Sequence, residues 1–307
     1  MSKALSLTKK KFLRNACFHS FVRLFFNVQM KVFRTVADLA SWVDNQYAAK
    51  RTIGFVPTMG ALHAGHIAVT NKAKAENDVV VVSVFVNPIQ FNNLNDLSRY
   101  PRTFESDNLM LTEAGVDAMF FPSVDEIYPV ACTVTFDMDG LDEYMEGPNR
   151  PGHFNGVVQV VTRLFDIVRP TQAYFGEKDF QQLAIIRHMT QKLGYDVKVV
   201  GCETVREESG LAMSSRNALL TPQNRALAIH IYRIMTEAKE ALQEDGVRKT
   251  KDIASQKLID VGFRPEYVEL VSSVTLAPVD TDWEGPIQMC LAVWAGDVRL
   301  IDNLRLN

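Results

Sequence analysis

A pair of histidines stands in the segment Pro57–His66 (PTMGALHAGH), between a predicted strand and a predicted helix. A strand-to-helix turn leaves backbone N–H groups free at the start of the helix, and such groups favour bound phosphate. His63 and His66 are three residues apart and therefore share one face of a helical turn. Imidazole donors aimed at a phosphate stabilise the charge that grows on it during transfer. The segment predicts a nucleotide-phosphate site; the alternative is a capped turn with two solvated histidines.

A second polar segment, Met213–Arg216 (MSSR), offers two hydroxyls and a guanidinium. Hydroxyl donors and an arginine suit the oxygens of a polyphosphate. Taken alone, the segment is as well explained by a surface loop that caps the next helix. An HxGH turn followed later in the chain by such a segment is typical of a nucleotidyltransferase that forms an acyl-adenylate or a related nucleotide product.

Two further segments follow predicted strands. In Gly176–Gln182 (GEKDFQQ), Lys178 could neutralise phosphate at the carboxyl edge of a sheet, and Gly176 permits close backbone approach. A solvated pair of Glu177 with Lys178 is the alternative. In the segment FVNPIQF, Asn87 and Gln90 are neutral amides beside hydrophobic residues, which suits the binding of hydroxyl and carboxylate groups. Asparagine also satisfies local backbone turns, which is the alternative for that segment.

The elements that must position these residues alternate along the chain. Strands are predicted at residues 52–56, 78–86, 117–121, 173–175 and 196–200, and helices at residues 37–46, 65–77, 106–114, 157–168 and 180–193. This alternation predicts an α/β fold, with a doubly wound parallel-sheet (Rossmann-like) nucleotide-binding domain whose ligands lie at the carboxyl ends of strands. Helices at 223–243 and 250–261 and strands at 267–271 and 289–294 predict a smaller α+β domain. We expect the domains to span residues 30–203 and 204–307.

The charge is distributed unevenly along the 307 residues. Residues 1–29 hold six Lys/Arg and no acidic residue, so the net charge of -3 leaves -9 for the chain from Met30 onward. An acidic body argues against a nucleic-acid-binding protein, which needs clustered Lys/Arg. No uninterrupted apolar run of 18 residues occurs, so no membrane span is predicted.

The cysteines and the basic extension bear on the compartment. Cys17, Cys132, Cys202 and Cys290 are widely scattered, so neither a disulfide framework nor a metal site is predicted, and a reducing, cytoplasmic location fits best. We expect residues 1–29 to be poorly ordered, and a chain beginning at Met30 to be fully active. A start of the protein at Met30, a transit peptide and a functional arm are the alternatives for this extension.

The ordered set of motifs from Met30 to Asn307 resembles the pantothenate synthetase (pantoate–β-alanine ligase) family of the HxGH nucleotidyltransferase superfamily. The resemblance rests on VPTMGALHAGH, VVVSVFVNPIQF, RYPRT, RPGHFNGV, FGEKDFQQL, GLAMSSRN and RLIDN. It implies an ATP-dependent ligase that condenses pantoate with β-alanine through a pantoyl adenylate and releases AMP and diphosphate. It also implies Mg²⁺ accompanying the triphosphate, a homodimer, small molecules as the only substrates, and a C-terminal domain that we expect to act as a lid.

The resemblance also assigns site residues. The ATP site would comprise Met59, Gly60, Ala61, Leu62, His63, Ala64, Gly65, His66, Gly176, Glu177, Lys178, Asp179, Val205, Met213, Ser214, Ser215 and Arg216. Gln90 and Gln182, with Asn87, would bind pantoate and β-alanine. His63, His66, Lys178 and Arg216 are the expected catalytic residues, because charge develops on the α-phosphate and on the departing pyrophosphate. The alternatives are another HxGH adenylyltransferase, acting on a different acid or on a phosphorylated acceptor, and a non-catalytic nucleotide-binding scaffold.

Overall fold

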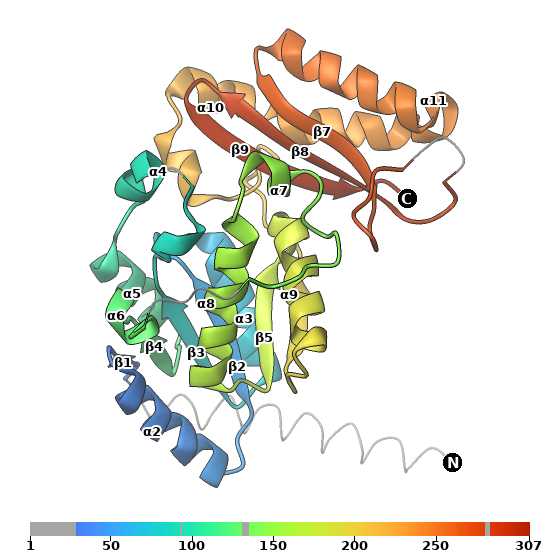
Figure 1. The fold of residues 1–307 in the computed structure, drawn as a ribbon. Coiled ribbons are helices and arrows are strands. Elements are labelled where there is room, and N and C mark those ends of the chain that lie inside the picture. The colour runs from blue at the N-terminus through green and yellow to red at the C-terminus, as the bar shows by residue number, and fades with distance from the viewer. Residues whose placement is uncertain (1–28, 93, 131–134, 280–282) are drawn as a thin grey trace, which may run out of the picture.

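The structure is a computed structural model, and it describes residues 29–307 apart from residues 93, 131–134 and 280–282 (Figure 1). The predictions for the basic extension, except for its last residue, lie outside the described residues. Cys17 and Cys132 also lie outside them, whereas Cys202 and Cys290 are buried free thiols.

Six strands form a parallel sheet: β1 (Lys31–Phe33), β2 (Ile53–Thr58), β3 (Val79–Val84), β4 (Ala118–Phe120), β5 (Gln172–Gly176) and β6 (Lys198–Cys202). Their order in space is β1-β4-β3-β2-β5-β6. The chain moves outward from β2 through β3 to β4 and then returns to β5 on the other side of β2. The strand order therefore reverses between β2 and β5, and ligands of doubly wound sheets bind at such a point. The three-residue edge strand β1 was not predicted, because so short a run shows no pattern.

Helices cover both faces of this sheet. They are α2 (Val36–Ala48), α8 (His153–Val168) and α9 (Phe180–Lys192) on one face, and α3 (Ala64–Glu76) and α5 (Phe104–Glu113) on the other. The valines of β3 alternate between two hydrophobic cores: Val79 and Val81 pack with the first group, and Val80 and Val82 with the second. A strand buried on both faces is what a doubly wound sheet requires, so the predicted fold class is confirmed.

The C-terminal residues form a separate antiparallel sheet, with strands β7 (Arg264–Ser272), β8 (Ile287–Ala295) and β9 (Val298–Arg305). This sheet and the adjacent helices have a hydrophobic core of their own. The strand β9 was missed in the sequence because Asp302 and Asn303 interrupt its apolar pattern, although both side chains are buried. The domain boundary near residue 203 stays a prediction.

The helices of this region differ from the prediction. The predicted helix 223–243 is divided near Ile229 into α10 (Pro222–Ala228) and α11 (His230–Val261). The predicted break between residues 243 and 250 falls at Gly246, whose non-helical φ of 71° and ψ of 168° divide α11 into two helical segments. Glycine permits this left-handed conformation without a steric cost, so the helix continues beyond it.

Short helical turns bring loop residues over the carboxyl ends of the strands. They are η1 (Pro88–Gln90), α4 (Leu94–Arg99), α6 (Val124–Ile127), α7 (Glu146–Asn149), η2 (Glu177–Asp179) and η3 (Ser215–Leu219). The turn η1 packs directly on the start of α8, since a Cβ at Gly156 would lie 2.9 Å from the Cα of Gln90. Glycine at this position therefore lets η1 approach α8.

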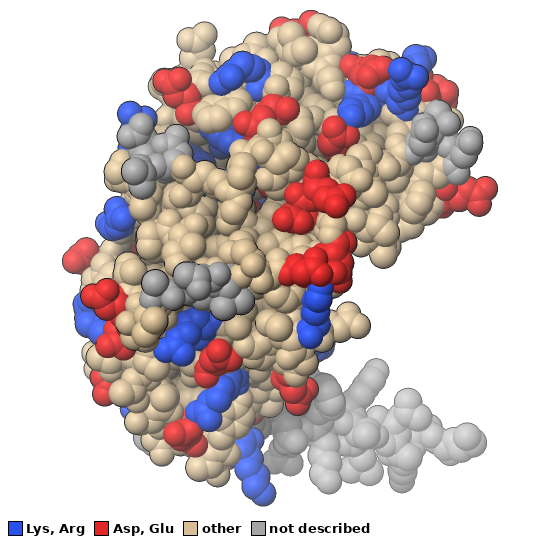
Figure 2. Space-filling view, in the orientation of Figure 1, with Lys and Arg blue, Asp and Glu red and all other residues tan. Residues whose placement is uncertain are grey.

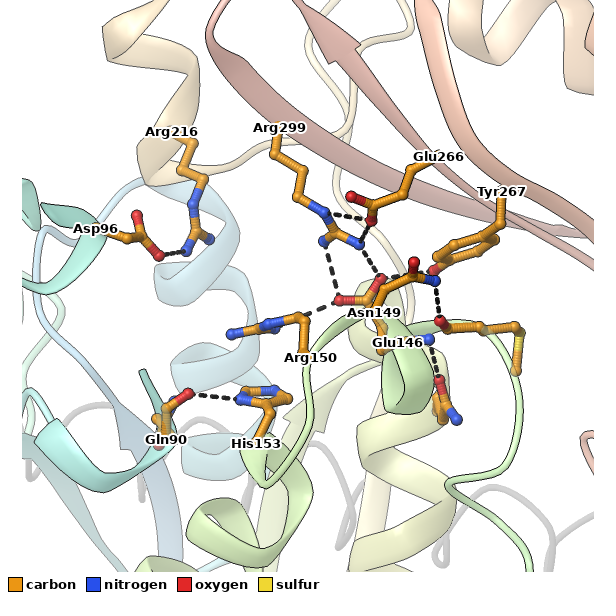
Figure 3. Close-up of polar contacts among 12 residues, drawn as sticks. Gln90, Asp96, Glu146, Asn149, Arg150, His153, Arg216, Glu266, Tyr267 and Arg299 are labelled. Carbon is orange, nitrogen blue, oxygen red and sulfur yellow. Dashed lines mark hydrogen bonds and ion pairs between the residues drawn. The ribbon is translucent and has the colours of Figure 1, made fainter. Parts of the chain in front are cut away.

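A buried carboxylate joins helix α7 to the C-terminal sheet (Figure 3). Glu146 of α7 accepts hydrogen bonds from both terminal nitrogens of Arg299 of β9, at 3.0 and 2.8 Å, and from the hydroxyl of Tyr267 of β7 at 2.7 Å. Burial raises the pKa of Glu146, but the hydrogen bonds and charge of Arg299 outweigh it and hold that pKa at about 2. Glu146 is therefore ionised at neutral pH and ties α7 to the C-terminal sheet.

Replacing Glu146 by glutamine should lower the free energy of unfolding by about 3 kcal/mol, because it leaves a buried guanidinium with one carboxylate partner fewer. Urea denaturation measures the change. Glu237→Gln is the matched control: Glu237 pairs with Lys257 at 2.6 Å on the surface of α11. Its loss should cost less than about 1 kcal/mol. Equal effects of the two substitutions would contradict the structural role of Glu146.

Charged side chains of both signs are interspersed over the described part of the face shown in Figure 2, without a broad basic area. The expectation that nucleic acid is not a partner stays a prediction. Among the residues described, none of the helices combines the length and hydropathy that crossing a bilayer requires.

Candidate active site

A cavity of about 230 Å³ lies at the carboxyl ends of β2 and β5, where the strand order reverses. Its apolar floor comes from α8, through Val157, Val160, Val161 and Leu164. Most of the predicted site residues line it: Met59, His63, Gly65, His66, Asn87, Gln90, Gly176, Lys178, Asp179, Gln182, Val205, Met213, Ser214, Ser215 and Arg216. The predicted residues Gly60, Ala61, Leu62, Ala64 and Glu177 are not part of the lining. The cavity thus unites the four predicted segments with helix α8.

Several backbone N–H groups of the HxGH turn are not free, which differs from the sequence-based expectation. The N–H groups of Ala61 and Leu62 donate to the carboxylate of Asp107 at 3.1 and 2.8 Å, and the N–H of Gly60 donates to the hydroxyl of Thr58 at 3.2 Å. Asp107 is 1% exposed and lies on α5, outside the cavity lining. Asp107 therefore holds the turn in place, and the N–H groups of Gly60, Ala61 and Leu62 are not available to a ligand.

The two histidines cap α3 reciprocally. The Nδ1 atom of His63 accepts a hydrogen bond from the N–H of Gly65 at 3.2 Å, and the Nδ1 atom of His66 accepts from the N–H of His63 at 3.3 Å. A ring nitrogen that accepts a hydrogen bond carries no proton, so the proton of each neutral ring lies on Nε2. Both rings line the cavity, with their centroids 4.1 Å apart. The pair thus presents two Nε2–H donors.

The environment keeps both rings neutral. Burial, with the charge of Lys178, lowers the pKa of His63 to about 4. Burial, with His63 and Lys178, lowers the pKa of His66 to about 3. Unfolded histidine binds a proton at higher pH than these rings do, so the two groups favour folding at neutral pH and lose that contribution as the pH falls from about 6.5 towards about 4. Both rings can therefore bind phosphate oxygens as neutral hydrogen-bond donors.

We predict that long-range ¹H–¹⁵N NMR spectra of the ligand-free protein will show His63 and His66 as neutral Nε2–H tautomers from about pH 8 down to about pH 5. The NMR signals of His63 and His66 can be compared with those of His230, which is the first residue of α11 and lies outside the cavity. Titration of His63 or His66 near the ordinary value of about 6.5, or a proton on Nδ1, would contradict the capping arrangement.

Lys178 supplies the positive charge of the cavity. Among the described residues, its ammonium group has no ion-pair or hydrogen-bond partner, although the carboxylate of Asp179 lines the same cavity. Its backbone is fixed from the other sheet, because the side-chain Nδ2 of Asn303 donates to the carbonyl oxygens of Glu177 and Lys178 at 2.9 and 2.8 Å. Asn303 is the last residue of the RLIDN motif, and it is the residue of that motif that holds the lysine turn, which is the turn η2 with Lys178.

Arg216 is differently placed from the prediction of an available cation. Its guanidinium donates to the carboxylate of Asp96 of α4 at 3.1 Å, so part of its charge is already neutralised (Figure 3). The hydroxyl of Ser214 accepts from the N–H of Arg216 at 3.3 Å and caps η3, which is the structural alternative considered for this segment. The hydroxyl of Ser215 lies 3.4 Å from the hydroxyl of Tyr100. A ligand phosphate would have to compete with Asp96 for Arg216.

The amide groups predicted to hold a substrate differ in availability. Asn87 is 1% exposed and fully engaged: its Nδ2 donates to Gln90 Oε1 at 3.1 Å and to the carbonyl of Gly156 at 3.0 Å, and its Oδ1 accepts from Tyr128 at 3.0 Å. Asn87 therefore orients Gln90, whose Nε2 lies 3.1 Å from the sulfur of Met59. The side chain of Gln182 has no hydrogen-bond partner among the described residues and is available to a ligand.

Sequence reasoning missed several residues of the lining. Thr58, Tyr100, Tyr174, Glu203 and Thr204 all face the cavity. Tyr100 belongs to the RYPRT motif, so the motif itself was a signal, although nothing in its composition shows which residue faces the site. No local pattern identifies Asp107, because its partners are 45 and 46 residues away in the sequence.

Three features define an HxGH-type nucleotidyltransferase. They are a doubly wound sheet, an HxGH turn after β2 and a turn with Lys178 after β5. Comparison with known proteins narrows this class. The family model for pantoate-beta-alanine ligase matches residues 31–305. The chain therefore belongs to the pantoate–β-alanine ligase family, and it is an ATP-dependent ligase that joins pantoate to β-alanine.

Individual relatives agree with this assignment. The chain is 49% identical over 280 residues to a pantothenate synthetase of Phocaeicola vulgatus, covering 90% of this chain and 99% of the relative. A crystal structure of the Thermus thermophilus pantothenate synthetase superimposes with a TM-score of 0.83 at 45% identity, covering 90% and 99% of the two chains. The Francisella tularensis pantoate-beta-alanine ligase, complexed with beta-gamma ATP and beta-alanine, superimposes with a TM-score of 0.76 at 36% identity, covering 90% and 98%.

Proposed function

We propose that the cavity between β2 and β5 carries out both steps of the ligase reaction, with the nucleotide beside His63, His66 and Lys178 and the acid beside Gln90 and Gln182. The observation that supports this most directly is that one cavity holds both phosphate-binding groups and groups that suit a hydroxy acid. Two neutral imidazole donors and an ammonium group suit phosphate, whereas two glutamine amides on an apolar floor suit a small hydroxy acid.

In the first step, a carboxylate oxygen of pantoate attacks the α-phosphorus of ATP, and the bond to the pyrophosphate oxygen breaks. The carboxylate is already the nucleophile, so no general base is needed. Negative charge grows on the α-phosphate oxygens and on the departing pyrophosphate. The Nε2–H groups of His63 and His66 and the ammonium group of Lys178 stabilise that charge from fixed positions. The Nδ1 atom of each ring is occupied in capping α3, so hydrogen-bond donation through Nε2–H, not proton transfer, is their role.

The substrate acid is held by its polar groups. Pantoate carries two hydroxyls, a carboxylate and a gem-dimethyl group, which match the amides of Gln90 and Gln182 and the valines of α8. Asn87 contributes by orienting Gln90, because its own amide atoms are already engaged. A phosphorylated acceptor would need additional cations near Gln90, which the segment Ile89–Phe91 does not supply.

We expect Mg²⁺ to enter with the ATP triphosphate as part of the substrate. Among the described residues, no group of three or more His, Cys, Asp or Glu side chains could hold a metal ion by itself. This fits an ion that keeps water and substrate phosphates as ligands. Asp179 and Glu203 are the carboxylates of the cavity lining, and they would be the protein groups nearest to such an ion. The ion would neutralise charge on the triphosphate.

The C-terminal sheet is proposed to act as a lid, since an acyl-adenylate must be protected from water. Two contacts support this: Asn303 reaches the lysine turn, and Glu146 binds Arg299. Adding ATP and pantoate should slow hydrogen–deuterium exchange across residues 205–217, and unchanged exchange would contradict the lid.

A homodimer is proposed from the family resemblance, and sedimentation of the purified protein tests it. A cytoplasmic location is proposed from the scattered cysteines, and cell fractionation tests it.

The deciding assay for the proposed function is pantoate-dependent exchange of labelled pyrophosphate into ATP. Exchange with pantoate and without β-alanine is expected, because adenylate formation is reversible before the second step. Exchange with another acid but not with pantoate would show that the protein catalyses a different adenylyltransferase reaction. Absence of exchange with every acid tested would leave only a nucleotide-binding scaffold.

A further inference from the structure

His153 is a buried histidine outside the HxGH turn. It is the first residue of α8, it is 5% exposed, and its Nδ1 lies 2.9 Å from the backbone carbonyl oxygen of Gln90. A carbonyl oxygen only accepts hydrogen bonds, so Nδ1 must be the donor and must carry the proton of the neutral ring. Nε2 is then unprotonated. This is the opposite tautomer to that of His63 and His66, whose proton lies on Nε2.

The His153 side chain lines a cavity that adjoins the proposed reaction centre. His153 lines a small cavity of about 30 Å³ that shares Lys178, Asp179 and Gln182 with the main cavity. Among the described residues, no group donates a hydrogen bond to Nε2. Figure 3 shows the ring between the carbonyl of Gln90 on one side and Arg150 with Glu146 on the other. The ring thus borders the small cavity, and its Nε2 lone pair is not used by any described residue.

The second step of the reaction needs such a group. The amine of β-alanine is protonated at neutral pH, and an ammonium nitrogen has no lone pair with which to attack a carbonyl carbon. His63 and His66 are unsuited to accept its proton, because the Nδ1 lone pair of each ring is used in capping α3. Lys178 is itself a cation. His153 offers an unused imidazole lone pair beside both Gln90 and Gln182.

We propose that His153 is the general base of the second step, accepting through Nε2 a proton from the ammonium group of β-alanine. This inference rests on the proposed function. The freed amine nitrogen attacks the acyl carbon of pantoyl adenylate, and the new C–N bond forms. The C–O bond to the phosphate then breaks, AMP leaves with the electron pair, and the second nitrogen proton passes to the phosphate oxygen of AMP. The imidazolium returns its proton to water.

Charges of both signs surround His153. Arg150 lies on one side and disfavours the imidazolium, whereas Glu146 of α7 and Asp179 of η2 favour it, and Lys178 also borders the cavity. Burial, followed by Arg150, lowers the pKa of His153 to about 4. The lone pair is therefore available throughout the neutral range. The protonated ring is short-lived, so the proton is released after each turnover.

The test separates the two steps in His153→Asn. The side-chain amide of asparagine can still donate to the carbonyl of Gln90, as Nδ1 does, but it has no basic nitrogen at the Nε2 position. Pyrophosphate exchange should stay within about threefold of wild type, whereas the rate of pantothenate formation should fall about 100-fold or more. Retained exchange also shows that the variant is folded. His188→Asn, on α9 beside Asp139, is the matched control and should leave both rates unchanged.

Hydroxylamine as the acceptor provides the second readout, because its nitrogen is largely unprotonated at neutral pH and needs no base. His153→Asn should form pantoyl hydroxamate at nearly the wild-type rate. Equal losses in exchange, hydroxamate formation and pantothenate formation would overturn the proposal and leave His153 as a support for Gln90. Near-normal pantothenate formation would overturn it as well. Failure of exchange in the wild-type protein would instead overturn the proposed function.

Discussion

His66→Ala is expected to lower pantoate-dependent exchange of pyrophosphate into ATP by about 100- to 1,000-fold, the usual effect of removing one fixed donor to a developing oxyanion. The Nε2–H of His66 faces the cavity because Nδ1 is held by the N–H of His63 at 3.3 Å. The donor is therefore oriented before ATP binds. Water that replaces the ring in the alanine variant would have to be reoriented as charge develops, so the loss should fall mainly on kcat.

Two conservative substitutions distinguish donation from capping at this position. Asparagine can accept from the N–H of His63, as Nδ1 does, but places no donor at Nε2. Glutamine places an amide N–H near the Nε2 position but has no acceptor at the Nδ1 position for the N–H of His63. His66→Asn should thus be the more stable variant, by about 1 kcal/mol, and His66→Gln the more active one. Equal activity in the two variants, or near-normal exchange in His66→Ala, would remove His66 from the mechanism.

The elements of the parallel sheet were predictable because their signal is local. The run Val79–Val84 is buried on both faces, and a continuous β-branched segment is the direct consequence of that burial. Most of the candidate site followed from motifs for a similar reason, since side chains after neighbouring parallel strands must meet at one edge. β9 escaped prediction because its buried Asp302 is satisfied by a distant partner: Arg206 donates to it at 2.6 and 2.9 Å.

The state of each site residue could not be predicted, because it depends on contacts that are remote in the sequence. Two N–H groups of the HxGH turn, those of Ala61 and Leu62, are bound by Asp107, and the expected cation of Arg216 is paired with Asp96. Asn87 lines the cavity but is used to hold Gln90. The tautomers of the histidines likewise follow from hydrogen bonds that composition and spacing do not reveal. Motifs thus located the residues, and the three-dimensional contacts assigned their roles.

Lys178→Met should have the other large effect, lowering kcat/KM for ATP by about 100- to 1,000-fold. Methionine keeps much of the length of the side chain and its apolar stem but removes the charge. Lys178 has no carboxylate partner among the described residues, so its substitution leaves no unpaired acid in that part of the chain, and the loss reports on the ligand. Lys192→Met is the matched control, because Lys192 pairs with Asp137 and Asp139 at the surface of α9, at 3.0 and 2.8 Å. It should leave kcat/KM unchanged.

The same substitution should change the titration of the histidines, which a purely structural role of the lysine side chain would not do. The charge of Lys178 lowers the pKa of both His63 and His66. Removing that charge must raise both values, so NMR should show the rings taking up protons at higher pH in Lys178→Met than in the wild type. Burial is the larger cause of the low values and persists, so neither pKa should reach its ordinary value of about 6.5. Unshifted titrations together with normal turnover would place the ammonium group away from the histidines and the nucleotide.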